Sequence, residues 1–289
     1  MELGKLGILG LFDGCTGTET ARLAQDIERL GYGALWFPHQ MGREPFSFAA
    51  TLLGRTDRLV VGTGVAIAFA YEPMIAASGA RTLSEAFHDR FILGLGVSNQ
   101  RYNSLRGFAY ERPVEFMREY LARMKSAPYE APRSVQEAPI VIAAMMPKML
   151  ELAAAETRGT LTYLTTTAQV AKYRAVLGPR PWLCAVQVVI LETDTANARA
   201  RAREYLALYL GIEHYLQRWK RFGFGDADFA GGGSDRLIDA VVAWGGEAEI
   251  RRRIADQLEA GATHVAMIPV DPRGGKAPDR RAIEALAPH

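Results

Sequence analysis

Residues 34–46 read ALWFPHQMGREPF. The first four residues are apolar without alternation, which is typical of a strand covered on both faces, as in a parallel sheet. Pro38 cannot donate to a strand ladder, so we expect the strand to end there. The next residue is His39, and the chain then becomes polar. The stretch therefore predicts a buried parallel strand with an ionisable side chain at its carboxyl end.

Further apolar runs of the same kind occur from end to end of the chain and alternate with segments of helical periodicity. The predicted strands are residues 7–12, 34–38, 59–66, 91–98, 140–145, 160–164, 184–191 and 264–270. Strands alternating with helices form a parallel sheet with crossover helices. Eight of them in 289 residues predict an α/β fold, a (β/α)8 TIM barrel, as a single domain over residues 1–289.

Several helix boundaries have a physical signal in the sequence. Thr16 and Glu19 have the spacing of a capping box, and Gly31 supplies a left-handed residue where that helix ends. Pro73 and Pro113 suit the first turn of a helix, where the missing N–H has no intrahelical partner. These signals place helices between the predicted strands.

One connection, between the seventh and eighth predicted strands, is much longer than the others. Residues 192–263 have room for two or three helices. Within them, RFGFGDADFAGGGSDR (221–236) is too glycine-rich for a regular element, and either a mobile flap or a surface loop fits it. The sequence therefore predicts an expanded helical insertion late in the barrel.

The composition excludes several classes of protein. A net charge of +2 indicates no nucleic-acid surface. The apolar run at residues 59–70 is too short for a membrane span, and residues 7–12 lack a cleavage site behind them. We expect Cys15 and Cys184 to be free thiols, as in a reducing compartment. Together these features predict a cytoplasmic protein without nucleic-acid or membrane partners.

In a closed α/β barrel, ligands bind at the carboxyl ends of the strands. The segments that follow five predicted strands are His39, Gly64–Ala66, Val97–Gln100, Ala144–Lys148 and Tyr163–Thr166. All of them are expected at one mouth. Metal-ligand spacings, Ser/His/Asp orders and phosphate-loop motifs do not occur, which favours an enzyme that takes its reactivity from an organic cofactor.

Two of these residues have more than one interpretation. His39 is either an acid/base group, since imidazole titrates near neutral pH, or a hydrogen-bonded histidine at a strand end. Lys148 lies in the first turn of a predicted helix, whose N–H groups and dipole suit a phosphate, but a solvated lysine fits equally well.

The chain also resembles the bacterial luciferase-like oxidoreductases, in particular the branch that uses the deazaflavin coenzyme F420. The similarity extends from Leu6 to Val270. The matching stretches are ALWFPHQMGREPF, LVVGTGVA, RFILGLGVSN, PIVIAAMMPKMLELAAAE, AGATHVAMIPV and RFGFGDADFAGGGSDRLIDAVVAWG.

The resemblance implies roles for particular residues. His39 matches the catalytic histidine of deazaflavin dehydrogenases in this family, and a cis peptide bond is implied at Gly64–Val65, behind the coenzyme ring. For the coenzyme the resemblance implies Gly64, Val65, Val97, Ser98 and Asn99 near the ring or tail, and Met145, Met146 and Lys148 at the phosphate. Ala144 and Tyr163 are added because they follow the fifth and sixth predicted strands at the same mouth.

The function that follows is hydride transfer between coenzyme F420 and a small or medium organic substrate, with reduction of an activated double bond or carbonyl as the expected direction. A homodimer is implied. Two alternatives remain open: a monooxygenase of the same fold that uses flavin mononucleotide (FMN), and a cofactor-binding or partner protein that has lost the chemistry.

Overall fold

The computed structural model describes residues 1–288 and shows eight parallel strands closed into a barrel. Around the barrel the strands follow the order β1, β2, β3, β5, β6, β7, β8 and β10, and β10 pairs with both β8 and β1. Their bounds are β1 Leu6–Leu9, β2 Ala34–Phe37, β3 Val60–Thr63, β5 Phe91–Gly96, β6 Ile140–Ala143, β7 Gly159–Tyr163, β8 Trp182–Leu191 and β10 His264–Pro269. Every predicted strand is confirmed, as is the TIM barrel.

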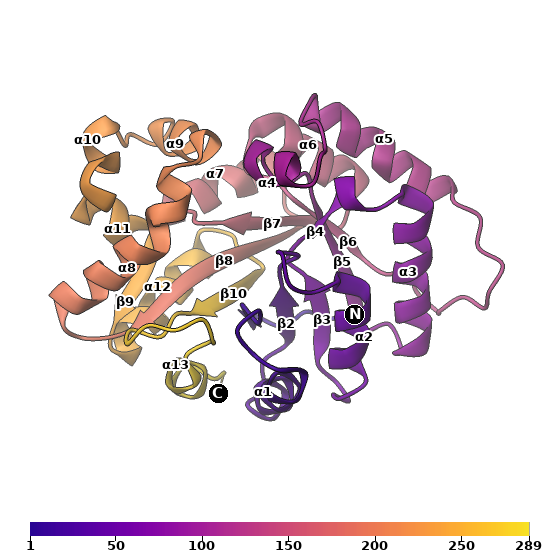
Figure 1. Ribbon diagram of the computed structural model, residues 1–289, viewed down its shortest axis with the longest axis horizontal. Coiled ribbons are helices and arrows are strands. Elements are labelled where there is room, and N and C mark those ends of the chain that lie inside the picture. The colour runs from indigo at the N-terminus through magenta and orange to yellow at the C-terminus, as the bar shows by residue number, and fades with distance from the viewer. Residues whose placement is uncertain (289) are drawn as a thin grey trace.

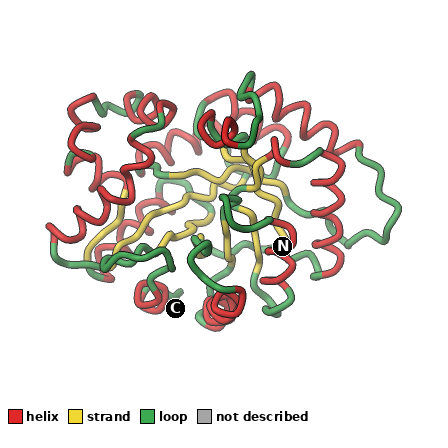
Figure 2. Tube along the Cα trace, in the orientation of Figure 1, coloured by secondary structure: helices red, strands yellow, loops and turns green. Residues whose placement is uncertain are grey.

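Helices surround these strands, which lie at the centre of Figure 2. Those that follow barrel strands are α1 Gly17–Arg29, α2 Pro45–Leu53, α3 Pro73–Ala86, α4 Gln100–Leu105, α5 Pro113–Ser126, α6 Pro147–Glu156, α7 Thr167–Leu177 and α13 Arg280–Ala285. Thr16 and Glu19 form the predicted capping box of α1, and Pro73 and Pro113 begin α3 and α5. Gly31 has the expected positive φ, +85°.

The strands separate two apolar layers. In β2, Leu35 and Phe37 belong to the cluster that contains Leu23, Ile27 and Leu52 of α1 and α2. The intervening residues Ala34 and Trp36 belong instead to a cluster inside the barrel. Because both faces of the strand are covered, the run is apolar throughout, which explains why the sequence shows no alternation.

The expanded connection is confirmed, although it contains more regular structure than the sequence predicted. It contains α8 Thr195–Leu210, α9 Glu213–Lys220, α10 Asp226–Phe229, the 3₁₀ helix η2 Ala230–Gly232, α11 Asp235–Val241, β9 Val242–Gly245 and α12 Glu247–Glu259. Helices α8 to α11 lie together at the left of Figure 1, and β9 extends the sheet by pairing with β8. The prediction of two or three helices was therefore too low. Several of these helices are short and separated by glycines, so they show no helical periodicity in the sequence.

The segment 221–236 is also more regular than predicted. The Asp228 carboxylate accepts hydrogen bonds from the Gly225 N–H (2.9 Å), the Ser234 hydroxyl (2.7 Å) and the Arg236 guanidinium (2.7 Å). These bonds hold the pKa of Asp228 well below its usual value, chiefly through Arg236. One aspartate therefore organises the glycine-rich segment into α10 and η2, and the prediction that it has no regular element is wrong.

None of the helices described is both long and apolar enough to cross a membrane.

The third barrel strand is interrupted at its carboxyl end. It stops at Thr63 and resumes as β4 Ala66–Ile67, which pairs with β5. The Thr63 hydroxyl donates to the Gly94 carbonyl (2.7 Å) and accepts from the Gly94 N–H (2.9 Å). A Cβ atom on Gly94 would lie 1.9 Å from the Thr63 carbonyl oxygen, so only glycine fits here.

Gly94→Ala is therefore expected to lower the free energy of unfolding by about 3 kcal/mol or more, at the upper end of what overpacking costs. Gly17→Ala is the matched control, because no atom lies within 4 Å of a Cβ at that position. Its effect should stay within about 1 kcal/mol. Urea unfolding followed by circular dichroism measures both, and equal stabilities for the two variants would contradict the packing described here.

Candidate active site

A cavity of about 350 Å³ opens at the carboxyl ends of the barrel strands. Strands and loops around β1 to β7 form its floor and one wall, and the helices α8 and α9 of the insertion close it from the other side. Its lining includes Leu9, Leu11, His39, Gly64, Val65, Gly96, Val97, Ser98, Asn99, Arg106, Met145, Met146, Leu161, Tyr163, Tyr209, His214, Tyr215 and Arg218. Its volume is in the range of small-molecule and cofactor sites.

Most of the residues expected at the mouth lie in this one cavity. They are His39, Gly64, Val65, Val97, Ser98, Asn99, Met145, Met146 and Tyr163. Ala144 and Lys148 do not line it. Ala144 is buried in the core, where its N–H donates to the Thr160 hydroxyl (3.1 Å), and Lys148 is exposed on α6. Both residues follow β6 in the sequence, but neither side chain lines the cavity, so the prediction that they lie at the mouth is wrong for these two.

The interruption of the third strand forms part of the cavity floor. The Gly64–Val65 peptide bond is cis, as the resemblance implied. The Gly64 N–H donates to the Phe37 carbonyl (2.7 Å), and the His39 N–H donates to the Val65 carbonyl (3.2 Å). The end of β2 is thus fastened to both sides of this bond, which fixes His39 beside it.

The side chain of His39 is half-buried and has one defined partner. Its Nδ1 accepts a hydrogen bond from the Ile67 N–H (3.4 Å). Because Nδ1 is an acceptor, the neutral ring carries its proton on Nε2. Burial lowers the pKa of His39, and the nearby Arg106 lowers it further. The neutral imidazole with Nε2–H is therefore the favoured form at neutral pH.

The turn after β5 is held by amide side chains. Asn99 caps α4 by accepting from the Tyr102 N–H (3.1 Å), and the Asn103 side chain donates to the Val97 carbonyl (2.9 Å). Ser98, which lies between Val97 and Asn99, has a positive φ of +57°. These contacts explain why the segment Val97–Asn99 lies against the cavity instead of extending the strand.

The insertion contributes a wall that the sequence did not predict. Tyr209, Tyr215 and Arg218 all come from α8 and α9. The Tyr163 hydroxyl is within hydrogen-bond distance of the hydroxyls of Tyr209 (2.8 Å) and Tyr205. The available signal was the presence of three tyrosines, one histidine and one arginine in residues 205–218, but sequence alone does not show which way an inserted helix faces.

Arg218 is the most deeply buried cation of this wall, with 1% of its surface exposed. Its guanidinium donates to the carbonyls of Tyr163 (2.8 Å) and Leu164 (2.7 Å) and to the sulfur of Met145. Burial lowers the pKa of the guanidinium from its usual value, although arginine stays protonated in proteins. Arg106 is the second arginine of the cavity, and among the described residues no aspartate or glutamate lines it.

Other residues considered for the site lie elsewhere. The apolar residues in and after the second predicted strand, and those after the third, suggest an apolar edge to the site, but none of them lines the cavity: Trp36, Phe37, Met41, Phe46, Phe69 and Tyr71. Trp36, for example, is fully buried in the barrel and donates to Nε2 of His264 (3.1 Å). Gln187, a polar residue within β8, could from its sequence position be a substrate ligand or a core amide. It is a buried core amide: it donates to the Val241 carbonyl and accepts from Gln257. Cys15 and Cys184 are free thiols, as predicted.

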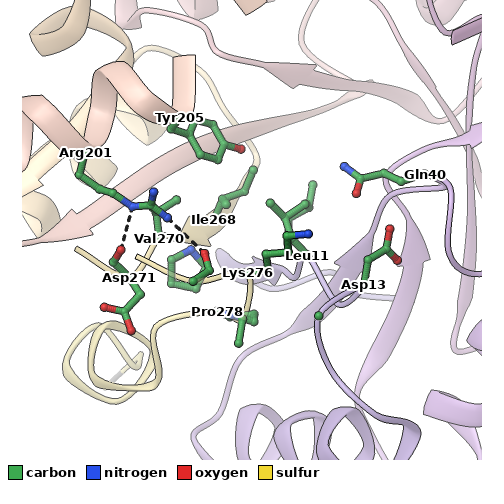
Figure 3. A pocket seen from close by; sticks show the side chains of 15 residues that line it. Leu11, Asp13, Gln40, Arg201, Tyr205, Ile268, Val270, Asp271, Lys276 and Pro278 are labelled. Carbon is green, nitrogen blue, oxygen red and sulfur yellow. Dashed lines mark hydrogen bonds between the residues drawn. The ribbon is translucent and has the colours of Figure 1, made fainter. Parts of the chain in front are cut away.

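A smaller cavity of about 200 Å³ lies beside the first and shares Leu9, Leu11 and Gln40 with it. Figure 3 shows Arg201 on one side of this cavity, and Asp13 and Gln40 on the other. The Arg201 guanidinium donates to the carbonyls of Asp271 (2.9 Å) and Gly275 (3.2 Å). This cavity therefore borders on the main site but has its own mixed charges.

Comparison with known proteins agrees with this architecture. The sequence profile of luciferase-like monooxygenases matches residues 13–264. The 5,10-methylenetetrahydromethanopterin reductase of Methanolobus tindarius is 26% identical, and the match covers 89% of this chain and 92% of that protein.

Two solved structures share the fold. The coenzyme F420-dependent tetrahydromethanopterin reductase of Methanopyrus kandleri superposes with a TM-score of 0.79 at 18% identity, covering 99% of this chain and 98% of that one. An F420-dependent secondary alcohol dehydrogenase, solved with an F420-acetone adduct, gives a TM-score of 0.78 at 14% identity, with the same coverage. With a family match over most of its length and this barrel, the chain belongs to the luciferase-like monooxygenase family.

Proposed function

We propose that this protein is an oxidoreductase that transfers a hydride between coenzyme F420 and a small or medium organic substrate, in the direction of reducing an activated double bond or a carbonyl. The observation that supports this best is the single cavity in which the interrupted third strand, His39 and the β6–α6 turn meet. The F420-dependent enzymes whose solved structures share the fold support the choice of coenzyme.

The residues of the cavity fit a planar ring with an anionic tail. Leu9, Val65 and Leu161 supply an apolar floor, and Gly96 leaves room beside Val65, where a Cβ would lie 2.5 Å from a Val65 methyl. Two arginines without carboxylates suit a ligand with negative charge. When bound in its reduced form, the deazaflavin would supply the hydride.

The hydrogen bonding of His39 supports the reductive direction. With Nδ1 occupied by the Ile67 N–H, the N–H on Nε2 is free to donate a hydrogen bond toward the cavity. A substrate that accepts a hydride at carbon develops negative charge on its oxygen, and a donor placed there stabilises that charge. Oxidation of an alcohol would instead need a free lone pair on Nε2, which this bonding disfavours.

The cavity walls are mainly apolar, which suits a substrate with few charges. An acidic group could still bind next to Arg106 or Arg218. The methionines Met145, Met146 and Met149 and the tyrosines of α8 and α9 supply adaptable apolar contacts. The homodimer and the cytoplasmic location stay predictions from the sequence.

Coenzyme binding tests this proposal first. Titration of the purified protein with F420, followed by coenzyme fluorescence, should give saturable binding that is at least about tenfold tighter than that of FMN. The alternative, an FMN-dependent monooxygenase, is favoured by the monooxygenases in the same family and predicts the opposite preference. Binding of neither coenzyme would contradict both.

Replacement of His39 tests the assigned donor. His39→Ala should lower kcat for reduction of activated enones or carbonyl compounds by about 10²- to 10³-fold, the usual contribution of one hydrogen-bond donor to a developing oxyanion. The dissociation constant for F420 should change little. His88→Asn is the control, since this histidine is exposed, does not line the cavity and has a positive φ (+54°) that asparagine tolerates, and the variant should retain most turnover. Full activity of His39→Ala would remove the assigned role while leaving the coenzyme assignment intact.

A further inference from the structure

We propose that Arg218 is the anchoring cation for an oxyanion of the bound ligand, either the phosphate of the coenzyme or an acidic group of the substrate. This inference rests on the proposed function in one respect, because it assumes that the cavity is the ligand site. It extends that function by inferring that the part of the ligand next to Arg218 on α9 carries a negative charge.

The first support is the absence of a counter-charge. Arg218 is almost completely buried, and no carboxylate in residues 1–288 forms an ion pair with it. Its Nε–H is buried and has no hydrogen-bond partner. A buried charge without a partner is costly, so proteins usually pair it or use it to bind a ligand. An oxyanion in the cavity that Arg218 lines would supply the missing negative charge.

The second support is that the guanidinium is held in a fixed position. The Tyr163 and Leu164 carbonyls accept hydrogen bonds from Nη1 and Nη2, and Leu164 has a positive φ of +50° in the turn that presents these carbonyls. The rings of Tyr215 and Trp219 lie 4.8 and 5.6 Å from the guanidinium carbon. Neutral carbonyls and rings orient the cation without cancelling its charge, and a preorganised arginine is a strong ligand for phosphate or carboxylate.

The third support is the neighbouring helix terminus. Helix α6 begins at Pro147, and its N-cap residue Met146 makes no side-chain capping bond. Met145 and Met146 line the same cavity as Arg218, and Arg218 touches the Met145 sulfur. A helix N-terminus and an arginine on one cavity form a suitable seat for an oxyanion. The sequence suggested Lys148 as the cation of this seat, but Lys148 is exposed, and Arg218 takes its place.

The experiment compares two pairs of ligands that differ only in phosphate: F420 with its phosphate-free deazaflavin riboside, and FMN with riboflavin. Dissociation constants for all four are measured by fluorescence on the wild type, Arg218→Met and Arg174→Met. Arg174 is the matched control, because it also donates to backbone carbonyls, those of Gly261 (2.9 Å) and Pro181 (3.0 Å), but does not line the cavity. Circular dichroism establishes that each variant is folded.

If the coenzyme phosphate is the oxyanion, Arg218→Met should weaken binding of the phosphate-bearing ligand by about 10- to 100-fold, the range of a charge-assisted hydrogen bond. Its phosphate-free partner should be unaffected, and Arg174→Met should change neither. If the substrate provides the oxyanion, all four affinities stay unchanged, and the KM for unsaturated acids rises at least tenfold while that for the matching amides does not.

Equal loss of phosphate-bearing and phosphate-free ligands, or no change in affinity together with no discrimination between acids and amides, would overturn the inference. Should Arg218→Met not fold, Arg218→Lys keeps the charge but loses the planar fork, and the same selective loss is expected at smaller size. If the wild type binds neither F420 nor FMN, the proposed function is contradicted but the role of Arg218 is not. That role is then tested with inorganic phosphate, which should raise the melting temperature of the wild type but not that of Arg218→Met. No rise for the wild type would overturn the inference.

Discussion

The site depends on the way the third barrel strand is interrupted without opening the barrel. The Thr63 hydroxyl bonds to both backbone groups of Gly94, so the ladder between β3 and β5 continues through a side chain where the backbone turns away. Since a Cβ on Gly94 would overlap the Thr63 carbonyl, this arrangement requires glycine. The freed segment at Gly64–Val65 forms the cavity floor and accepts the His39 N–H, so one local constraint positions both the floor and the imidazole.

The remaining wall of the cavity comes from a distant part of the sequence. Helices α8 and α9 belong to the long connection between β8 and β10. Helix α8 contributes Tyr209 to the cavity, and α9 contributes Tyr215 and Arg218. The insertion is therefore more than a surface addition: it supplies the most buried cation of the cavity. In this account the barrel provides the flat apolar floor, whereas the insertion provides the charge that selects the ligand.

Physical signals in the sequence were sufficient for the barrel and for the strand ends. Continuous apolar runs such as residues 34–38 identify strands covered on both faces, and the mouth of a barrel gathers whatever follows them, which is why His39, Val97 and Met146 were placed together. The same reasoning was wrong for residues whose place in the cavity depends on the direction of the side chain. Lys148 follows a strand but points into solvent, and Trp36 lies inside the barrel below the site.

Other parts of the site could not be predicted from local patterns. Arg218 reaches the cavity only through the tertiary packing of α9 against β7, and its partners are backbone carbonyls that leave no trace in the sequence. The glycine-rich segment 221–236 looked irregular because its order comes from one carboxylate, Asp228, and not from helix propensity.

A crystal structure of the protein with F420 tests the central claim most directly. The account predicts that the deazaflavin ring lies against the Gly64–Val65 segment with His39 beside it, inside the cavity closed by α8 and α9. A coenzyme bound in the smaller cavity next to Arg201, or anywhere with its ring away from Val65 and His39, would contradict it.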